Sequence, residues 1–197
     1  MTNTGFLKPA LLGLACAGLC GAAAAAPMTY QIDPAHTYPT FEADHLGGLS
    51  YWRGKFNKTT GTVVYDQEGQ SGSVDITVDA SSIDFGNDAL NTHAKSPDMF
   101  DVGQFPTAHY TGKLAGFQNG LPTRIDGELT LHGVTRPLTL TINKFTCKNN
   151  PMNQKPVCGA DASAQLDRSD FDITFGQPIF DMGVTLRISV EAAPVQN

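Results

Sequence analysis

Apolar and polar residues alternate with a period of two along much of this chain, and this alternation is the feature that most constrains its fold. It is clearest where Val74, Ile76 and Val78 are separated by Asp75 and Thr77, and it recurs over residues 125–131, 138–142, 162–166 and 184–191. An extended strand with this pattern has one apolar and one polar face. Such strands are typical of antiparallel sheets that cover a core on one side, so the pattern predicts an all-β fold.

Weaker strand patterns cover residues 29–32, 40–46, 51–56, 60–66 and 107–117. Turn-forming pairs separate several of the strands, among them Asn119 with Gly120 and His132 with Gly133. Strands at such short spacing, about eight to ten in all, predict a β-barrel or a β-sandwich.

One segment, residues 87–101, breaks the alternation. Asn87 can cap a short helix that carries Leu90 and His93, and Pro97 after Ser96 favours a second helical turn. We therefore expect a short helical insertion between two strands of a single domain that covers residues 26–197.

The N-terminal residues have the composition of an export signal. Lys8 is the only charged residue before an apolar run over residues 9–19, and small residues follow up to residue 26. This arrangement predicts a signal peptide over residues 1–25, with cleavage after Ala24 or Ala25. The apolar run is too short for a membrane span, and the residues before Cys16 and Cys20 do not fit a lipid-attachment signal. We expect no stable membrane insertion.

The charge balance argues against nucleic acid as a partner. The chain has 13 lysines and arginines against 19 aspartates and glutamates, a net charge of −6, and it has no basic stretch. Removal of Lys8 with the signal leaves 12 − 19 = −7. Nucleic acids and anionic membrane surfaces are therefore poor electrostatic partners.

Two cysteines, Cys147 and Cys158, remain after the signal. An exported protein reaches an oxidising compartment, which favours a structural disulfide over two free thiols or a redox pair. The spacing is not Cys-x-x-Cys, and Pro151 and Pro156 indicate a turn between the cysteines.

The sequence lacks the common catalytic motifs, including the Gly-x-Ser-x-Gly elbow, His-Glu-x-x-His and a glycine-rich phosphate loop. His36 and His45 could meet across strands and bind a metal with Asp44 or Glu42, although histidines on strands are more often structural. A metal-assisted hydrolase is therefore an alternative.

Three aspartates, Asp167, Asp170 and Asp172, surround Arg168 in the sequence. They could form a carboxylate pair for acid–base chemistry. A turn with salt bridges to Arg168 is the interpretation that we favour.

Many aromatic residues lie outside the apolar faces of the predicted strands. Several inward positions on the strands instead carry small residues: Ala80, Gly127, Ala162 and Ala164. Closed barrels of about eight strands can be filled by side chains or can hold a ligand. This combination predicts a cavity suited to a long apolar ligand, and a filled barrel that binds other proteins is the alternative.

Segments along the whole mature chain resemble the YceI-like family of bacterial periplasmic proteins. The segments that carry the resemblance include residues 30–36 (YQIDPAH), 82–87 (SIDFGN), 98–101 (DMFD), 127–137 (GELTLHGVTRP) and 168–171 (RSDF). The resemblance implies an antiparallel up-and-down, lipocalin-like β-barrel of about eight strands, located in the periplasm, that binds a polyprenyl compound or quinone. It implies no catalysis and no cofactor other than such a lipid, a possible homodimer, and a subgroup with a disulfide-stapled hairpin.

The resemblance also implies a set of ligand-binding residues. The lipid tail would lie against Phe41, Trp52, Phe85, Met99, Phe100, Phe105, Leu129 and Phe171. Its polar end would lie near His45, His93 and Arg168. Leu90 and Asn91 stand where some members have Arg-Asp, which favours a neutral headgroup such as a quinone over a phosphorylated one. Met99 replaces a phenylalanine of the family motif, and Asp172 replaces a glycine.

Overall fold

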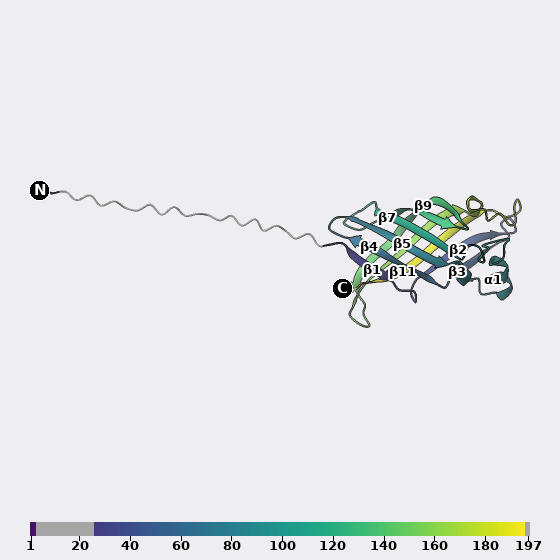
Figure 1. The fold of residues 1–197 in the computed structure, drawn as a ribbon, viewed down its shortest axis with the longest axis horizontal. Helices are drawn as coiled ribbons and strands as arrows, with labels where there is room; N and C mark the ends of the chain where they lie inside the picture. The colour runs from purple at the N-terminus through teal and green to yellow at the C-terminus, as the bar shows by residue number, and fades with distance from the viewer. Residues whose placement is uncertain (3–25, 196–197) are drawn as a thin grey trace.

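The computed structural model describes residues 1–2 and 26–195. The predicted signal peptide falls almost entirely on residues outside this range, so it stays a prediction. Residues 28–194 form one antiparallel sheet that closes on itself, with a single α-helix among the described residues (Figure 1).

Eight strands form the closed circle of the barrel, each paired in an antiparallel manner with its neighbours. In their order around the barrel they are β1 (Met28–Ile32), β4 (Thr59–Asp66), β5 (Ser71–Asp79), β7 (Thr107–Ala115), β8 (Arg124–Leu131), β9 (Val134–Asn149), β10 (Pro156–Asp167) and β11 (Gly183–Pro194). Pairing of β11 with β1 closes the circle. The predicted barrel of about eight antiparallel strands is confirmed.

Three further strands extend the barrel wall at one end: β2 (Tyr38–His45), β3 (Ser50–Phe56) and β6 (Ile83–Asp84). β2 continues β1 along the same side of β11, and β3 pairs with β2 just as β4 pairs with β1. β1 and β2 thus form one long strand that is interrupted by a few residues, and β3 and β4 form another. Counted in this way, successive strands run antiparallel to each other, as in an up-and-down barrel.

The predicted helical insertion lies at this extended end. Helix α1 (Asp88–Ala94) is capped by Asn87, whose Oδ1 accepts a hydrogen bond from the Leu90 amide at 3.0 Å. Two 3₁₀ helices, η1 (Ala80–Ser82) and η2 (Arg168–Phe171), also follow strands here. Figure 1 shows α1 at the opposite end of the barrel from the C-terminus. In the described part of the chain, no helix has the length and hydropathy of a membrane span.

We expected four small residues to line the cavity, and most of them do not. Ala162 is the one of the four that lines the cavity. Gly127 instead makes room for Tyr110, because a Cβ at Gly127 would lie 2.6 Å from the Tyr110 Oη. That hydroxyl donates to the Leu138 carbonyl oxygen at 2.9 Å, and burial raises the pKa of Tyr110. The Tyr110 side chain thus fills the space that Gly127 leaves in the barrel wall.

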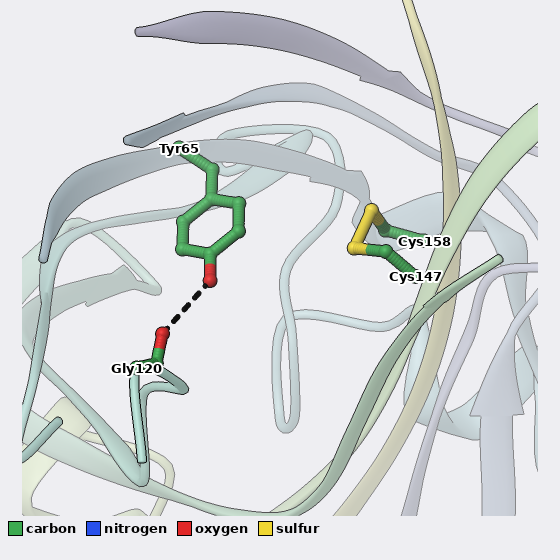
Figure 2. The surroundings of a disulfide bond; sticks show 4 residues. All are labelled: Tyr65, Gly120, Cys147 and Cys158. Atoms are coloured by element: carbon green, nitrogen blue, oxygen red, sulfur yellow. Dashed lines mark hydrogen bonds between the residues drawn. A yellow bond between two sulfur atoms is a disulfide. The ribbon is translucent and has the colours of Figure 1, made fainter. Parts of the chain in front are cut away.

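Cys147 and Cys158 are joined in a disulfide with an S–S distance of 2.01 Å. Figure 2 shows this bond. The two cysteines lie directly opposite each other on β9 and β10, so the bond fastens this hairpin at the barrel end away from α1. The predicted structural disulfide is present.

Candidate functional site

The barrel encloses a cavity of about 320 Å³, within the usual size range of ligand pockets. Every second residue of β11 from Val184 to Ala192 lines it. At about 3.3 Å per residue, this face of the strand is about 26 Å long. The cavity therefore extends along the barrel from the α1 end to the disulfide end, and its walls are almost entirely apolar.

Aromatic rings surround the mouth of the cavity at the α1 end. His45 stacks on Trp52 with ring centroids 3.9 Å apart, and Phe180 meets His45 edge-on at 5.7 Å. His93 from α1 lies 4.7 Å from Phe175. Trp52 is 37% exposed and Phe175 is 43% exposed, so this end opens toward solvent.

Just inside the mouth, the cavity wall is a cluster of phenylalanine side chains. Phe41 on β2 contacts the rings of Phe85 at 5.3 Å and Phe56 at 5.7 Å, and Phe56 contacts Phe100 at 5.8 Å. Gly54 opposite Phe41 leaves room for these rings, because a Cβ at this position would lie 2.6 Å from the Phe41 ring. The α1 insertion thus supplies one wall of the cavity.

Arg168 is a buried cation in the cavity wall. Its Nη1 donates to the Ile173 carbonyl oxygen at 2.8 Å and its Nη2 to the Phe175 carbonyl oxygen at 2.6 Å. Burial lowers the pKa of this guanidinium. Backbone carbonyls satisfy part of its donor set, and a guanidinium has five N–H groups in all.

The predicted salt-bridged turn around Arg168 is wrong. Arg168 makes no ion pair with any residue in the described ranges. Asp167 instead caps η2, where its Oδ1 accepts from the Ser169 amide at 2.8 Å. Asp167 precedes Arg168 in the sequence, so it is well placed to cap the 3₁₀ turn. It is less well placed to reach the Arg168 side chain, which points into the barrel.

Nine of the eleven predicted ligand-binding residues line the cavity: Phe41, His45, Trp52, Phe85, His93, Met99, Phe100, Leu129 and Arg168. Phe105 and Phe171 lie outside its lining. The Phe105 ring packs 4.4 Å from the His132 ring, and the His132 Nδ1 bonds to the carbonyl oxygen of the buried Phe171 at 3.0 Å. Both residues pack beneath the β8–β9 turn, which sequence spacing does not reveal.

Two lining residues that the sequence reasoning missed are Tyr65 on β4 and Phe145 on β9. Tyr65 continues the alternation of Val63, so its inward direction could have been predicted. Phe145 could not, because the register of β9 against β10 shifts at Asn143. The extra residue reverses the alternation after Ile142 and brings Phe145 onto the inner face.

The residues proposed for a metal site do not converge. The His36 Nδ1 pairs with Asp33 at 2.8 Å in the break between β1 and β2, and this contact raises the pKa of His36. His45 lies at the other end of β2, in the stack with Trp52. Within residues 26–195, no group of three or more histidine, cysteine, aspartate or glutamate side chains is arranged to hold a metal ion.

The two carboxylates considered as metal ligands have other partners. Glu42 accepts from Arg187 Nε at 2.7 Å and from Arg53 Nε at 2.8 Å, and these bonds lower the pKa of Glu42. Asp44 accepts the backbone amides of Gly48 at 2.6 Å and Asp181 at 3.0 Å. Asp44 therefore ties the β2–β3 turn to the loop before β11 beside the cavity mouth.

Comparison with known sequences gives a consistent result across the chain. A model of the YceI-like domain matches residues 30–192. The chain is 31% identical over 189 residues to the protein YceI of Salmonella arizonae, an alignment that covers 94% of this chain and 97% of that protein. The protein YceI of Salmonella enteritidis matches with the same identity and coverage.

Solved structures share the same fold. The crystal structure of BcnA from Burkholderia cenocepacia superposes with a TM-score of 0.66 at 21% identity, covering 82% of this chain and 99% of that one. A polyisoprenoid binding domain from Saccharophagus degradans superposes with a TM-score of 0.61 at 13% identity, covering 85% and 99%. At these identities the likeness concerns the fold alone.

Proposed function

The chain belongs to the YceI-like family, and from that premise we propose that it is a periplasmic carrier that holds a long isoprenoid lipid inside its barrel. The structural neighbour described as a polyisoprenoid binding domain supports this class of ligand. The proposed activity is binding, with no chemical change of the lipid.

The observation that carries the proposal is the long apolar cavity. Its lining runs from Trp52 and His93 at the mouth to Phe145 and Cys158 at the other end, and aliphatic and aromatic side chains make up most of it. Burying apolar surface is favourable by about 25 cal/mol per Å². A long hydrocarbon chain can therefore bind tightly here with few polar contacts, whereas a polar substrate would leave its hydrogen-bonding groups unpaired.

Two residues at the α1 end, Leu90 and Asn91, support a neutral headgroup. Leu90, which stands where some family members have arginine, lines the cavity with an apolar side chain. Asn91 turns elsewhere, because its Oδ1 accepts from the Phe85 amide at 2.7 Å and its Nδ2 donates to Asp84 at 3.2 Å. His45, His93 and Arg168 remain as hydrogen-bonding groups near the mouth. They suit the carbonyl oxygens of a quinone.

The periplasmic location in this proposal rests on the predicted signal peptide over residues 1–25. The disulfide between Cys147 and Cys158 agrees with it, since disulfides persist in oxidising compartments. The homodimer implied by the family resemblance stays a prediction.

The experiment that tests the proposal is native mass spectrometry of the exported protein, followed by organic extraction and identification of the bound lipid. We expect a bound species with the mass of a polyprenyl compound or quinone. A protein purified without lipid that also fails to bind added ubiquinone and polyprenyl lipids would contradict the proposal. It would leave a barrel that acts through other partners.

A further inference from the structure

A pair of aromatic rings crosses the inside of the barrel at the end away from α1. Tyr65 on β4 and Phe145 on β9 meet edge-on, with ring centroids 5.3 Å apart and an interplanar angle of 70°. In the circle of eight strands, β4 and β9 are four steps apart in either direction. The two strands therefore lie on opposite sides of the barrel, and the contact between their side chains spans its interior.

The Tyr65 ring is held in place by a contact outside the pair. Tyr65 is 5% exposed, and its hydroxyl donates to the Gly120 carbonyl oxygen at 3.1 Å, in the turn between β7 and β8 (Figure 2). The Tyr65 side chain thus extends from β4, and its hydroxyl is fixed to the turn between β7 and β8.

The disulfide restrains the strand that carries the second ring. Cys147 lies two residues beyond Phe145 on β9 and is bonded to Cys158 of β10, and Cys158 is itself a buried lining residue. Figure 2 shows the disulfide and the Tyr65–Gly120 hydrogen bond in the same region. The bond keeps β9 and β10 together two residues from Phe145.

The two ends of the cavity therefore differ. At the α1 end Trp52 and Phe175 are 37% and 43% exposed, whereas at the other end Tyr65 is 5% exposed and bonded to the β7–β8 turn, and Phe145 is partly buried against it. We propose that Tyr65 and Phe145 form a floor that stops the tail of the ligand, so that this ring pair sets the longest chain the barrel accepts. This inference rests on the proposed function, and it adds that Tyr65 and Phe145 determine the chain length of the lipid that binds.

The test compares chain-length limits. Wild-type protein and variants are each incubated with a mixture of ubiquinones that differ only in the number of isoprene units, and native mass spectrometry identifies the longest one retained. Tyr65→Leu and Phe145→Leu each remove one ring of the floor. Tyr65→Phe keeps the ring and removes the hydroxyl, and Tyr51→Leu removes a tyrosine that lies outside the cavity lining at the other end.

We expect Tyr65→Leu and Phe145→Leu to raise the limit by at least one isoprene unit, and Tyr65→Phe and Tyr51→Leu to keep the wild-type limit. An unchanged limit in both floor variants, with near-ultraviolet circular dichroism showing native packing, overturns the floor and leaves the carrier function standing. A wild-type protein that retains neither a ubiquinone of any length nor an added polyprenyl lipid rejects the carrier function itself.

A second measurement uses only the wild-type protein, so that it does not depend on the folding of variants. A polyprenyl probe with a photoreactive group at the end of its tail is bound, irradiated and mapped by peptide mass spectrometry. Labelling of the peptides that contain Tyr65 or Phe145 supports the floor. Labelling confined to the peptides around His45 and His93 contradicts it.

Discussion

At the scale of single residues, Arg168 shows how backbone carbonyls can hold a buried cation in an apolar wall. Its planar guanidinium donates to two carbonyl oxygens of the segment that follows η2, those of Ile173 and Phe175. Arginine suits this role because its donors are fixed in a fork and its charge is retained on burial. The segment before β11 is therefore folded around one side chain.

Replacing this arginine tests that role. Arg168→Met leaves both carbonyls without their donor, and we expect a loss of about 1–3 kcal/mol of unfolding free energy for each carbonyl that stays buried and unpaired. Urea denaturation measures it. The control is Arg53→Met, because the Arg53–Glu42 ion pair has a side chain that is 68% exposed, and such pairs contribute about 0–1 kcal/mol. Equal losses for the two variants would contradict the role of Arg168.

Asp44 links two loops at the cavity mouth through its charge. Burial alone would raise its pKa, but the amide donors of Asp181, Gly48 and Gly47 outweigh burial and hold the pKa below the ordinary value of 3.8. A carboxyl with a lowered folded-state pKa stabilises the fold at pH values above its unfolded pKa, and this stabilisation is lost as the pH falls through the folded pKa.

We therefore expect the contribution of Asp44 to be complete at neutral pH and to fade below about pH 3.8, the ordinary carboxyl pKa. Unfolding free energies measured by urea denaturation between neutral and strongly acidic pH would show this. Asp44→Asn should lower stability at neutral pH and make its dependence on pH shallower in the acidic range. Parallel pH profiles for the two proteins would show that Asp44 is not a source of acid sensitivity.

At the scale of structural elements, the hairpin of β9 and β10 is the longest in the barrel and carries the disulfide. Its strands continue beyond the alternating segments 138–142 and 162–166 that predicted them. A β-bulge at Asn143 explains why the alternation of β9 stops before the strand does. The bulge is held across the hairpin by Asn143 Nδ2, which donates to Asp161 Oδ1 at 3.0 Å and to Ser163 Oγ at 3.1 Å. Past the bulge the apolar residues change face, so the pattern no longer reads as a continuous strand.

Removing the disulfide tests how much the hairpin depends on it. For a closed loop with a sequence separation of 11 residues, the chain-entropy relation gives a loss of about 3 kcal/mol in unfolding free energy. We expect this loss in the double variant Cys147→Ser, Cys158→Ser, measured by urea denaturation. Wild-type protein measured in a reducing buffer should match the double variant. A difference below about 1 kcal/mol would show that the hairpin is held by its strand pairing alone.

At the scale of the whole molecule, the floor that we propose would give the barrel one open end and one closed end. Strand continuations and α1 build the open mouth, and the ring pair with the nearby disulfide builds the closed end. A lipid in this cavity would have its headgroup among His45, His93 and Arg168 and its tail pointing toward Tyr65. On this proposal a lipid enters from the α1 end.

A charge at the mouth should block this entry. Trp52 and Tyr51 are neighbours on β3 whose side chains point to opposite faces, and only Trp52 lines the cavity. We expect Trp52→Asp to raise the Kd for lipid at least roughly tenfold and so to lower lipid occupancy, because desolvating a carboxylate beside the tail costs more than the 1.4 kcal/mol that corresponds to this factor.

Native mass spectrometry of the two variants gives the lipid occupancy. Tyr51→Asp is the matched control, since Tyr51 is 64% exposed, and it should keep wild-type occupancy. Equal occupancy in wild type and Trp52→Asp would count against the entry of lipid at this end.

Much of the fold could be predicted because alternation is a local property. Residues 74–80 and 184–191 show which side chains face inward without reference to the rest of the chain, and Asn87 identifies the start of α1. The sequence pattern by itself thus determined the all-β class of the fold and favoured the pairing of Cys147 with Cys158, and the family resemblance supplied nine of the residues that line the cavity.

Tertiary structure alone decided what depends on residues that meet across the barrel. The contact of Tyr65 with Phe145, the stack of His45 on Trp52 and the packing of Phe105 away from the cavity each join elements distant in sequence. Such contacts follow from strand order and from a one-residue bulge, and a shift of one residue exchanges the two faces of a strand. The open and closed ends of the cavity therefore come from the closure of the sheet, which local patterns do not specify.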